Sequence, residues 1–64
     1  MIVVDVIRRP AKEKRAVITR SGGKDGDCVW FDLWKFQSGV RVGNRSMFTT
    51  LEGAKARALI WLRR

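Results

Sequence analysis

The sequence predicts an α+β fold, in which one C-terminal helix packs on one face of an antiparallel meander of three or four strands. Two patterns lead to this prediction. Up to Phe48, segments rich in β-branched and aromatic residues alternate with turn-forming residues. After Thr49, apolar residues recur at helical spacing. With 64 residues, the chain (1–64) is expected to be a single small basic domain with a small core.

The first two strands are predicted on either side of Pro10. Residues 2–7 are β-branched at five of six positions, with Asp5 as the exception, which is typical of a strand. Pro10 cannot donate to a strand ladder and therefore ends this segment. Residues 14–20 form the second strand. In the three-strand alternative, residues 2–7 are only an edge.

The third and fourth strands are predicted from the next two segments. A glycine-rich hairpin loop at 21–27 leads into the third strand at 28–36. A short turn centred on Gly39, which tolerates a positive φ, joins it to a fourth strand at 40–48. A Gly-Asn pair weakens the middle of this last strand.

The helix is predicted from a capping box and an apolar stripe. Thr49 and Glu52 have the Thr-x-x-Glu spacing, so the helix is expected to begin within a residue or two of Thr49. Arg63 and Arg64 suit the negative end of the helix dipole. Helical spacing places five apolar residues on one stripe: Leu51, Ala54, Ala58, Trp61 and Leu62.

A single helix covers only one face of the sheet, so strand alternation divides the side chains into two sets. The predicted core is the helix stripe together with Ile2, Val4, Val6, Val29, Phe31, Leu33, Val40, Val42 and Phe48. The uncovered face is predicted to carry Trp30, Asp32, Trp34, Arg41 and Arg45. Because an unpaired carboxylate is costly to bury, we expect this face to be open, with Trp30 and Trp34 partly exposed and Trp61 buried.

The charge balance points to an anionic partner. The chain has 14 Lys and Arg against 6 Asp and Glu, a net charge of +8. Residues 1–32 hold seven basic and five acidic side chains, whereas residues 33–64 hold seven basic side chains and one acidic one. Such a charge on a small body attracts polyanions, of which nucleic acid is the commonest inside a cell. An acidic protein partner and mere solubility are the alternatives.

The residue types favour binding over catalysis. The chain has no histidine and no tyrosine, and no carboxylate pair is expected in a cleft, so we predict no enzyme activity, catalytic residue, cofactor or metal. Asp25 and Asp27 fit turn-forming roles in the glycine-rich loop. The Ser-Gly-Gly-Lys run lacks phosphate-loop spacing, although Lys24 is free to contact a phosphate backbone.

The cellular setting is predicted from what the chain lacks. Cys28 is the single cysteine and is interpreted as a small strand residue without a disulfide partner. A small domain without disulfides is typical of intracellular proteins, which predicts a cytoplasmic location. No segment approaches the ~20 apolar residues that cross a bilayer, so no membrane association is expected.

The tryptophans of the uncovered face allow three interpretations. Bases stack on aromatic rings for roughly 1–3 kcal/mol each while arginines neutralise phosphates, which favours a nucleic-acid interface. Trp and Arg also anchor protein interfaces, including a homodimer that buries both Trp faces. The third interpretation is internal cation–π packing of Arg41 or Arg45 over the tryptophans.

Residues 14–64 resemble a known DNA-binding domain. A Trp-bearing strand at 29–35, a Gly turn with a basic strand at 39–45, and the stretch 48–56 with its Thr-x-x-x-Ala-Lys-Ala run follow one another. This order resembles the arm-type, AP2-like DNA-binding domains of phage tyrosine integrases. The resemblance implies that the sheet enters the major groove of DNA and that Lys35, Arg41 and Arg45 contact the DNA backbone or its bases. Asp32 and Trp34 depart from it, because a DNA reader would have polar donors there.

The leading hypothesis is therefore a non-enzymatic nucleic-acid-binding accessory protein of phage or mobile-element type, with DNA favoured over RNA. Its predicted contacts are Lys24, Trp30, Trp34, Lys35, Arg41, Arg45, Arg63 and Arg64. The alternative is a small phage-type inhibitor or adaptor that docks through the same Trp/Arg face on a host protein, one that is acidic or processes nucleic acid.

Overall fold

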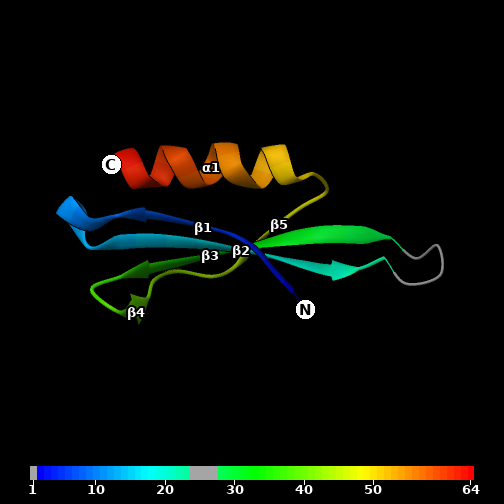
Figure 1. The fold of residues 1–64 in the computed structure, drawn as a ribbon, viewed down its shortest axis with the longest axis horizontal. Helices are drawn as coiled ribbons and strands as arrows, with labels where there is room; N and C mark the ends of the chain where they lie inside the picture. The colour runs from blue at the N-terminus through cyan, green and yellow to red at the C-terminus, as the bar shows by residue number, and fades with distance from the viewer. Residues whose placement is uncertain (1, 24–27) are drawn as a thin grey trace.

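The chain forms an antiparallel sheet with one C-terminal helix lying along one of its faces (Figure 1). This computed structural model describes residues 2–23 and 28–64; Lys24, Asp25 and Asp27 of the predicted hairpin loop lie outside them. The elements in chain order are β1 (Ile2–Arg9), a 3-10 turn (Pro10–Lys12), β2 (Lys14–Gly22), β3 (Val29–Gln37), β4 (Val40–Arg41), β5 (Ser46–Phe48) and α1 (Leu51–Arg63). The predicted α+β meander is confirmed.

The sheet has the order β1-β2-β3, and the outer edge of β3 is shared by β4 and β5. β4 pairs with the end of β3 and β5 pairs with its middle, so Trp34 and Lys35 lie between the two short partners. The continuous fourth strand predicted at 40–48 is therefore wrong. Gly43, with a φ of +68°, departs from extended geometry and interrupts it.

The core lies between α1 and the two central strands. Its buried members are Ala16 and Ile18 of β2, Leu33 of β3, and Ala54, Ala58 and Leu62 of α1. Phe31 and Phe48 pack against this cluster from the side. The predicted orientation of Phe31 and Leu33 toward the helix is confirmed. Trp61, predicted to be buried, is only half-buried at the margin of the core.

Several predicted core residues are exposed instead, namely Ile2, Val4, Val6, Val29 and Val40. For Val4 and Val6 the cause is a register shift between Val3 and Asp5, a β-bulge that moves the side-chain alternation by one residue, whereas Ile2 lies before the bulge and pairs with the exposed Arg20. Beyond it, Ile7 turns toward the helix and Val6 away from it. Val29 lies near the tip of the β2–β3 hairpin, which projects past the start of α1 (Figure 1).

The helix begins at Leu51, two residues after Thr49, as expected. Its N-cap is Thr50 rather than Thr49. Thr50 has an extended backbone, and its side-chain oxygen accepts a hydrogen bond from the Gly53 N–H at 3.1 Å. The predicted capping box from Thr49 to Glu52 is therefore wrong: the cap lies one residue later, and Gly53 has no side chain that could complete a box.

Candidate nucleic-acid interface

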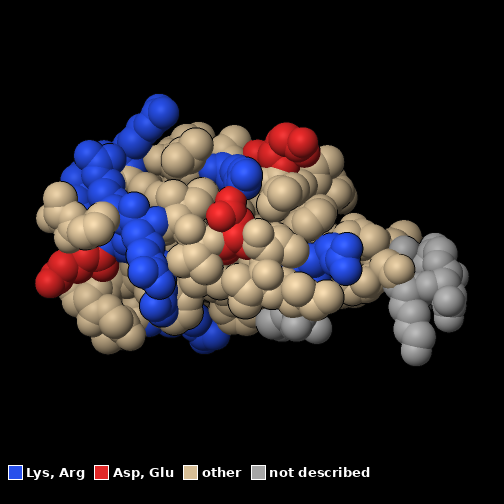
Figure 2. Space-filling model, in the orientation of Figure 1, with Lys and Arg blue, Asp and Glu red and all other residues tan. Residues whose placement is uncertain are grey.

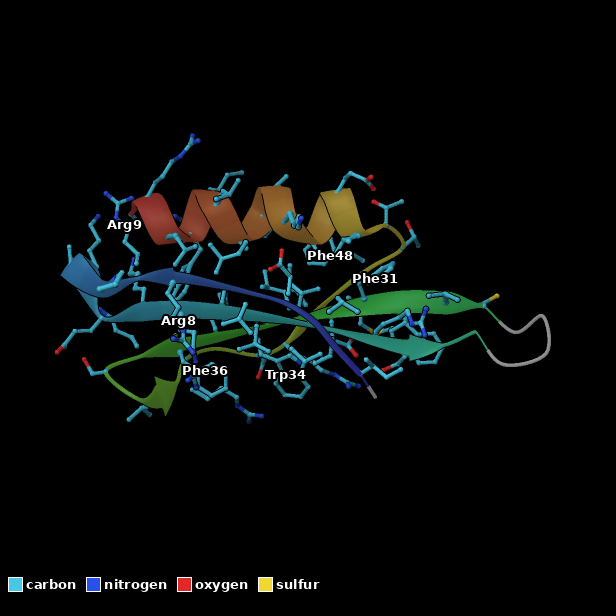
Figure 3. All side chains as sticks on the ribbon, viewed as in Figure 1. Arg8, Arg9, Phe31, Trp34, Phe36 and Phe48 are labelled. Atoms are coloured by element: carbon cyan, nitrogen blue, oxygen red, sulfur yellow. The ribbon has the colours of Figure 1, made fainter. Side chains whose placement is uncertain are left out.

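The sheet face opposite α1 carries no covering element among the residues that the structure describes, and we call it the open face (Figure 3). Strand register assigns its side chains. They are Val3, Val6 and Arg8 of β1; Arg15, Val17, Thr19 and Ser21 of β2; Trp30, Asp32, Trp34 and Phe36 of β3; Arg41 of β4; and Met47 of β5.

One line of cross-strand neighbours on the open face is strongly basic. Arg8 pairs with Arg15, Arg15 pairs with Phe36, and Phe36 pairs with Arg41. We call these four residues the arginine row. The guanidinium carbon of Arg15 lies 4.7 Å from the centroid of the Phe36 ring, so the ring supports this cation from the neighbouring strand. The row therefore crosses four strands of the sheet.

The arginines of the row have no ion-pair partner in the described part of the chain, although the carboxylate of Glu13 lies beside them. Like charges directly opposite each other on neighbouring strands destabilise a sheet. Arg8, Arg15 and Arg41 nevertheless take part in no ion pair there. The carboxylate of Glu13, which lines a hollow of ≈ 270 Å³ beside the row, accepts a hydrogen bond from Ser38 at 2.7 Å. An external anion would relieve the mutual repulsion of these arginines.

Trp34 occupies the next position along the open face, where its partner on β2 is Val17. Its indole Nε1 donates to the Thr19 hydroxyl oxygen at 3.0 Å. The guanidinium carbons of Arg41 and Arg45 lie 5.6 and 5.8 Å from the ring centroid. The ring is half-buried, as expected, and the cation–π packing named among the interpretations is present. Trp34 thus holds two arginines of the open face in place.

Asp32 was predicted to lie on an uncovered sheet face. Its strand register does place it on the open face, but the residue is completely buried (0% exposed). One carboxylate oxygen accepts a 3.4 Å hydrogen bond from Ser21 and lies 3.8 Å from an Arg45 nitrogen. The other has no hydrogen-bond partner within the described residues. Its neighbours on the same face are Trp30 and Trp34 along the strand and Thr19 and Met47 on the adjacent strands. Asp32 therefore serves as an internal anchor for Arg45.

A second concentration of positive charge lies where α1 ends beside the turn from β1 to β2 (Figure 2). The Lys14 ammonium donates to the main-chain oxygens of Trp61 at 3.1 Å and Arg64 at 2.9 Å. Lys12 donates to the main-chain oxygen of Arg63 at 3.1 Å. Burial lowers the pKa of Lys14, and the nearby charges of Lys12, Arg64 and Arg9 lower it further. These lysines satisfy carbonyls that the helix end leaves unpaired.

The other predicted contact residues are spread over the molecule. Trp30 is half-buried on the open face, at the hairpin end beyond Trp34. Lys35 has the opposite orientation to Trp34 and lies on the helix side of the sheet, in a groove that Arg64 also lines. Arg63 is exposed at the end of α1. Of the predicted residues that the structure describes, which exclude Lys24, only Trp30, Trp34, Arg41 and Arg45 are therefore grouped on the open face.

Two arginines of the row were missed from the sequence, Arg8 and Arg15. Arg15 could have been found. Ala16 and Ile18 are apolar and alternate along β2, so they face the core, and Arg15 between them and Lys14 must face the other side. Arg8 could not, since its side follows from the β-bulge earlier in β1.

No family model, no curated protein and no solved structure matches this sequence. Within residues 2–23 and 28–64, no helix is long and apolar enough to cross a membrane. The same residues contain no cluster of three or more His, Cys, Asp or Glu side chains that could hold a metal ion.

Proposed function

We propose that this protein is a non-enzymatic nucleic-acid-binding protein and that the arginine row is its main contact surface. The observation that supports the proposal best is the alignment of Arg8, Arg15 and Arg41 across the sheet without an ion-pair partner among the described residues. A sheet accepts such repulsion at a cost to its own stability, and local rules of this kind are broken mainly at functional positions.

The dimensions of the row suit a phosphate backbone. Neighbouring strands lie about 4.8 Å apart, so a line across four strands extends roughly 14 Å. The row presents three arginines over this length, one for each of about three successive phosphates of a nucleic-acid strand. The guanidinium group offers a planar fork of donors to phosphate oxygens. The phosphate contacts thus account for affinity without base recognition.

Trp34 and Arg45 have supporting roles in this proposal. The indole N–H of Trp34 is already bonded to Thr19, and its ring faces arginines, so its first role is to orient Arg41 and Arg45. Arg45 is tied to the buried Asp32 at 3.8 Å, which leaves less of its charge for a ligand. Arg15 and Arg8, without such a tie, are the stronger phosphate ligands.

The proposal is tested by fluorescence anisotropy with labelled single-stranded DNA, duplex DNA and single-stranded RNA at low salt. Arg15→Gln removes a row contact and is expected to weaken binding about tenfold, because charged hydrogen bonds contribute roughly 1.5–3 kcal/mol each. Arg20→Gln is the matched control: it removes the same charge from the same strand but from the opposite face, since Arg20 pairs with Phe31. Its affinity should stay close to that of the wild type.

The rival function, an inhibitor or adaptor that docks on a protein, is supported by a different part of the open face. Val3 and Met47 are each 59% exposed and lie next to the buried Asp32 and its partner Thr19. Exposed apolar side chains of this kind occur at protein interfaces. Absence of binding to all three nucleic acids at low salt, or equal losses in both variants, would reject the arginine row and favour this rival.

A further inference from the structure

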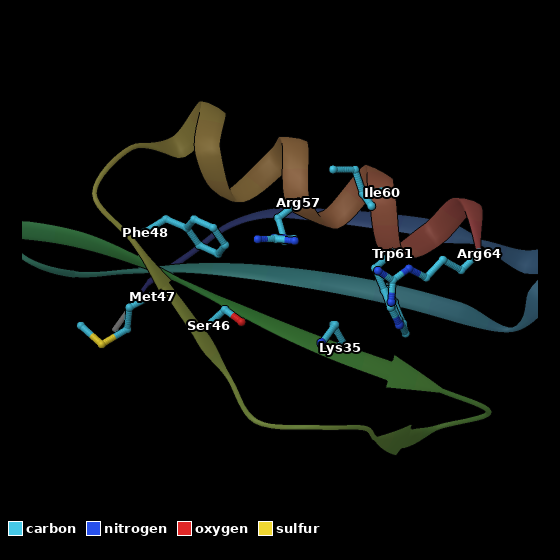
Figure 4. Close-up of a pocket in the computed structure, with 8 residues that line it drawn as sticks. All are labelled: Lys35, Ser46, Met47, Phe48, Arg57, Ile60, Trp61 and Arg64. Atoms are coloured by element: carbon cyan, nitrogen blue, oxygen red, sulfur yellow. The ribbon is translucent and has the colours of Figure 1, made fainter.

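A groove of ≈ 360 Å³ lies on the helix side of the sheet, between the flank of α1 and β5 (Figure 4). It lies where the chain leaves β3, after the Val42 N–H donates to the Lys35 carbonyl oxygen at 2.9 Å and before β5 pairs with Leu33. Gly43 lies against this space without a side chain: a Cβ placed there would be 3.6 Å from the Lys35 ammonium. The groove is therefore a product of the interrupted edge, and it shares only Met47, at that edge, with the side chains assigned to the open face.

The charges around this groove all have the same sign. It is lined by Lys35 of β3, by Arg57 of α1 and by Arg64, the residue that follows α1, and Figure 4 shows all three around the same space. No carboxylate lines it, and these three cations form no ion pair within the described residues. By contrast, Lys55 on the same helix is paired with Asp5 at 3.3 Å. Three unpaired cations around one hollow repel one another unless an anion binds between them.

The remaining lining suits an anion that carries an apolar, planar group. Trp61, Phe48 and Ile60 form apolar walls, and Ser46 adds a hydroxyl group. Phosphate matches the arginine forks, and a base or sugar matches the aromatic and aliphatic walls. These are the two parts of a nucleotide. An acidic peptide would supply carboxylates, which match the arginine forks less specifically than a phosphate joined directly to a sugar and a planar base.

We propose that this groove is a second subsite, which holds a nucleotide of a single-stranded nucleic acid bound to the open face. This inference rests on the proposed function. Trp34 and Lys35 are consecutive on β3 and point to opposite faces, at the gap between β4 and β5. A nucleic-acid strand that contacts Arg41 and Arg45 on the open face reaches the groove by passing over this edge of the sheet. Duplex DNA is stiff over about 50 nm and does not turn so sharply, so the geometry selects single strands.

Nuclear magnetic resonance separates the two subsites, because the indole N–H of Trp34 reports on the open face and that of Trp61 on the groove. The probe is an oligothymidylate of about 12 nucleotides, within the range of site sizes of single-strand binders. In the wild type we expect both indole signals to shift and the single strand to bind about tenfold more tightly than a duplex of equal length. In Arg57→Gln the Trp61 shift should disappear while the Trp34 shift persists, and the preference for single strands should be lost. Arg20→Gln, which lines neither hollow, should behave as wild type.

The outcomes keep the two proposals apart. A shift of Trp34 without any shift of Trp61, or an unchanged single-strand preference in Arg57→Gln, would overturn the groove subsite and leave the open-face proposal standing. If inorganic phosphate alone shifted Trp61 as strongly as the oligonucleotide, the groove would be an ion site and the nucleotide assignment would be overturned. If neither indole moved and no nucleic acid bound, the proposed function itself would fail, and the subsite with it.

Discussion

Lys14 shows how one side chain joins the sheet to the end of the helix. Its ammonium group caps two main-chain oxygens of α1 and lies 4.9 Å from the centroid of the Trp61 ring. It is only 9% exposed and is surrounded by other cations, so its charged form is less stable than in water. The residue therefore combines a favourable hydrogen-bonding role with an electrostatic cost.

This cost gives a pH-dependent prediction. Since the folded pKa of Lys14 is lowered from 10.5, the unfolded state binds more protons than the folded state just below pH 10.5. The contribution of Lys14 to the free energy of unfolding must therefore rise with pH just below pH 10.5. We expect the free energy of unfolding of the wild type, relative to Lys14→Met, to increase as pH approaches 10.5, measured by urea denaturation at several pH values. A difference that stays flat or falls would show that Lys14 is not desolvated.

At the residue scale, the sequence predicted the part of the candidate interface around Trp34 but missed Arg8 and Arg15 of the arginine row. Trp34, Arg41 and Arg45 were grouped correctly, because both arginines follow the same tight turn from the tryptophan strand. The burial of Asp32 could not be predicted, because it depends on how large neighbours close over a sheet face. Arg8 entered the site only through strand register, which a single sequence does not contain.

At the scale of elements, two neighbouring threonines at the start of α1 each have a hydroxyl group that is able to cap the helix. The Thr-x-x-Glu spacing selects Thr49, whereas the structure assigns the cap to Thr50. The extended backbone of Thr50 brings its hydroxyl oxygen to the Gly53 N–H. A one-residue displacement of this kind is common at helix ends, where several side chains compete for the same free N–H groups.

The two threonines provide a matched pair of variants. Thr50→Ala removes the cap and is expected to lower the free energy of unfolding by about 1 kcal/mol. Thr49→Ala removes the same atoms without a capping bond and should change it by less than about 0.5 kcal/mol. Thermal unfolding followed by circular dichroism distinguishes them. Equal effects, or a larger effect at Thr49, would contradict the observed cap.

The strands illustrate what alternation can and cannot predict. β3 followed simple alternation, so Phe31 and Leu33 were correctly assigned to the helix side. β1 did not, because its bulge reverses the alternation halfway along a run of β-branched residues that fit either face. The groove beside Lys35 was equally inaccessible to prediction, since it depends on the departure of the chain from β3 at Gly43.

On the scale of the whole molecule, positive charge lies on both faces of the sheet, next to the edge that β4 and β5 form on β3. The arginine row lies on the open face, and the cations of the groove lie on the helix side, with residues 42–45 between them. The net charge of +8 predicted an anionic partner but not this division. Two basic surfaces joined over a narrow edge favour a flexible polyanion over a rigid one.

The most direct test of this account is the salt dependence of single-strand binding, measured for the wild type and for the triple variant Arg8→Gln, Arg15→Gln, Arg41→Gln. Each phosphate contact on a single strand contributes about 0.7 to the slope of log Kobs against log salt concentration. Loss of the three row contacts should therefore flatten the slope by about 2. Circular dichroism must show that the triple variant is folded, which is expected because all three side chains are exposed. An unchanged slope in the folded variant, or a wild type that binds no single strand even at low salt, would contradict the account.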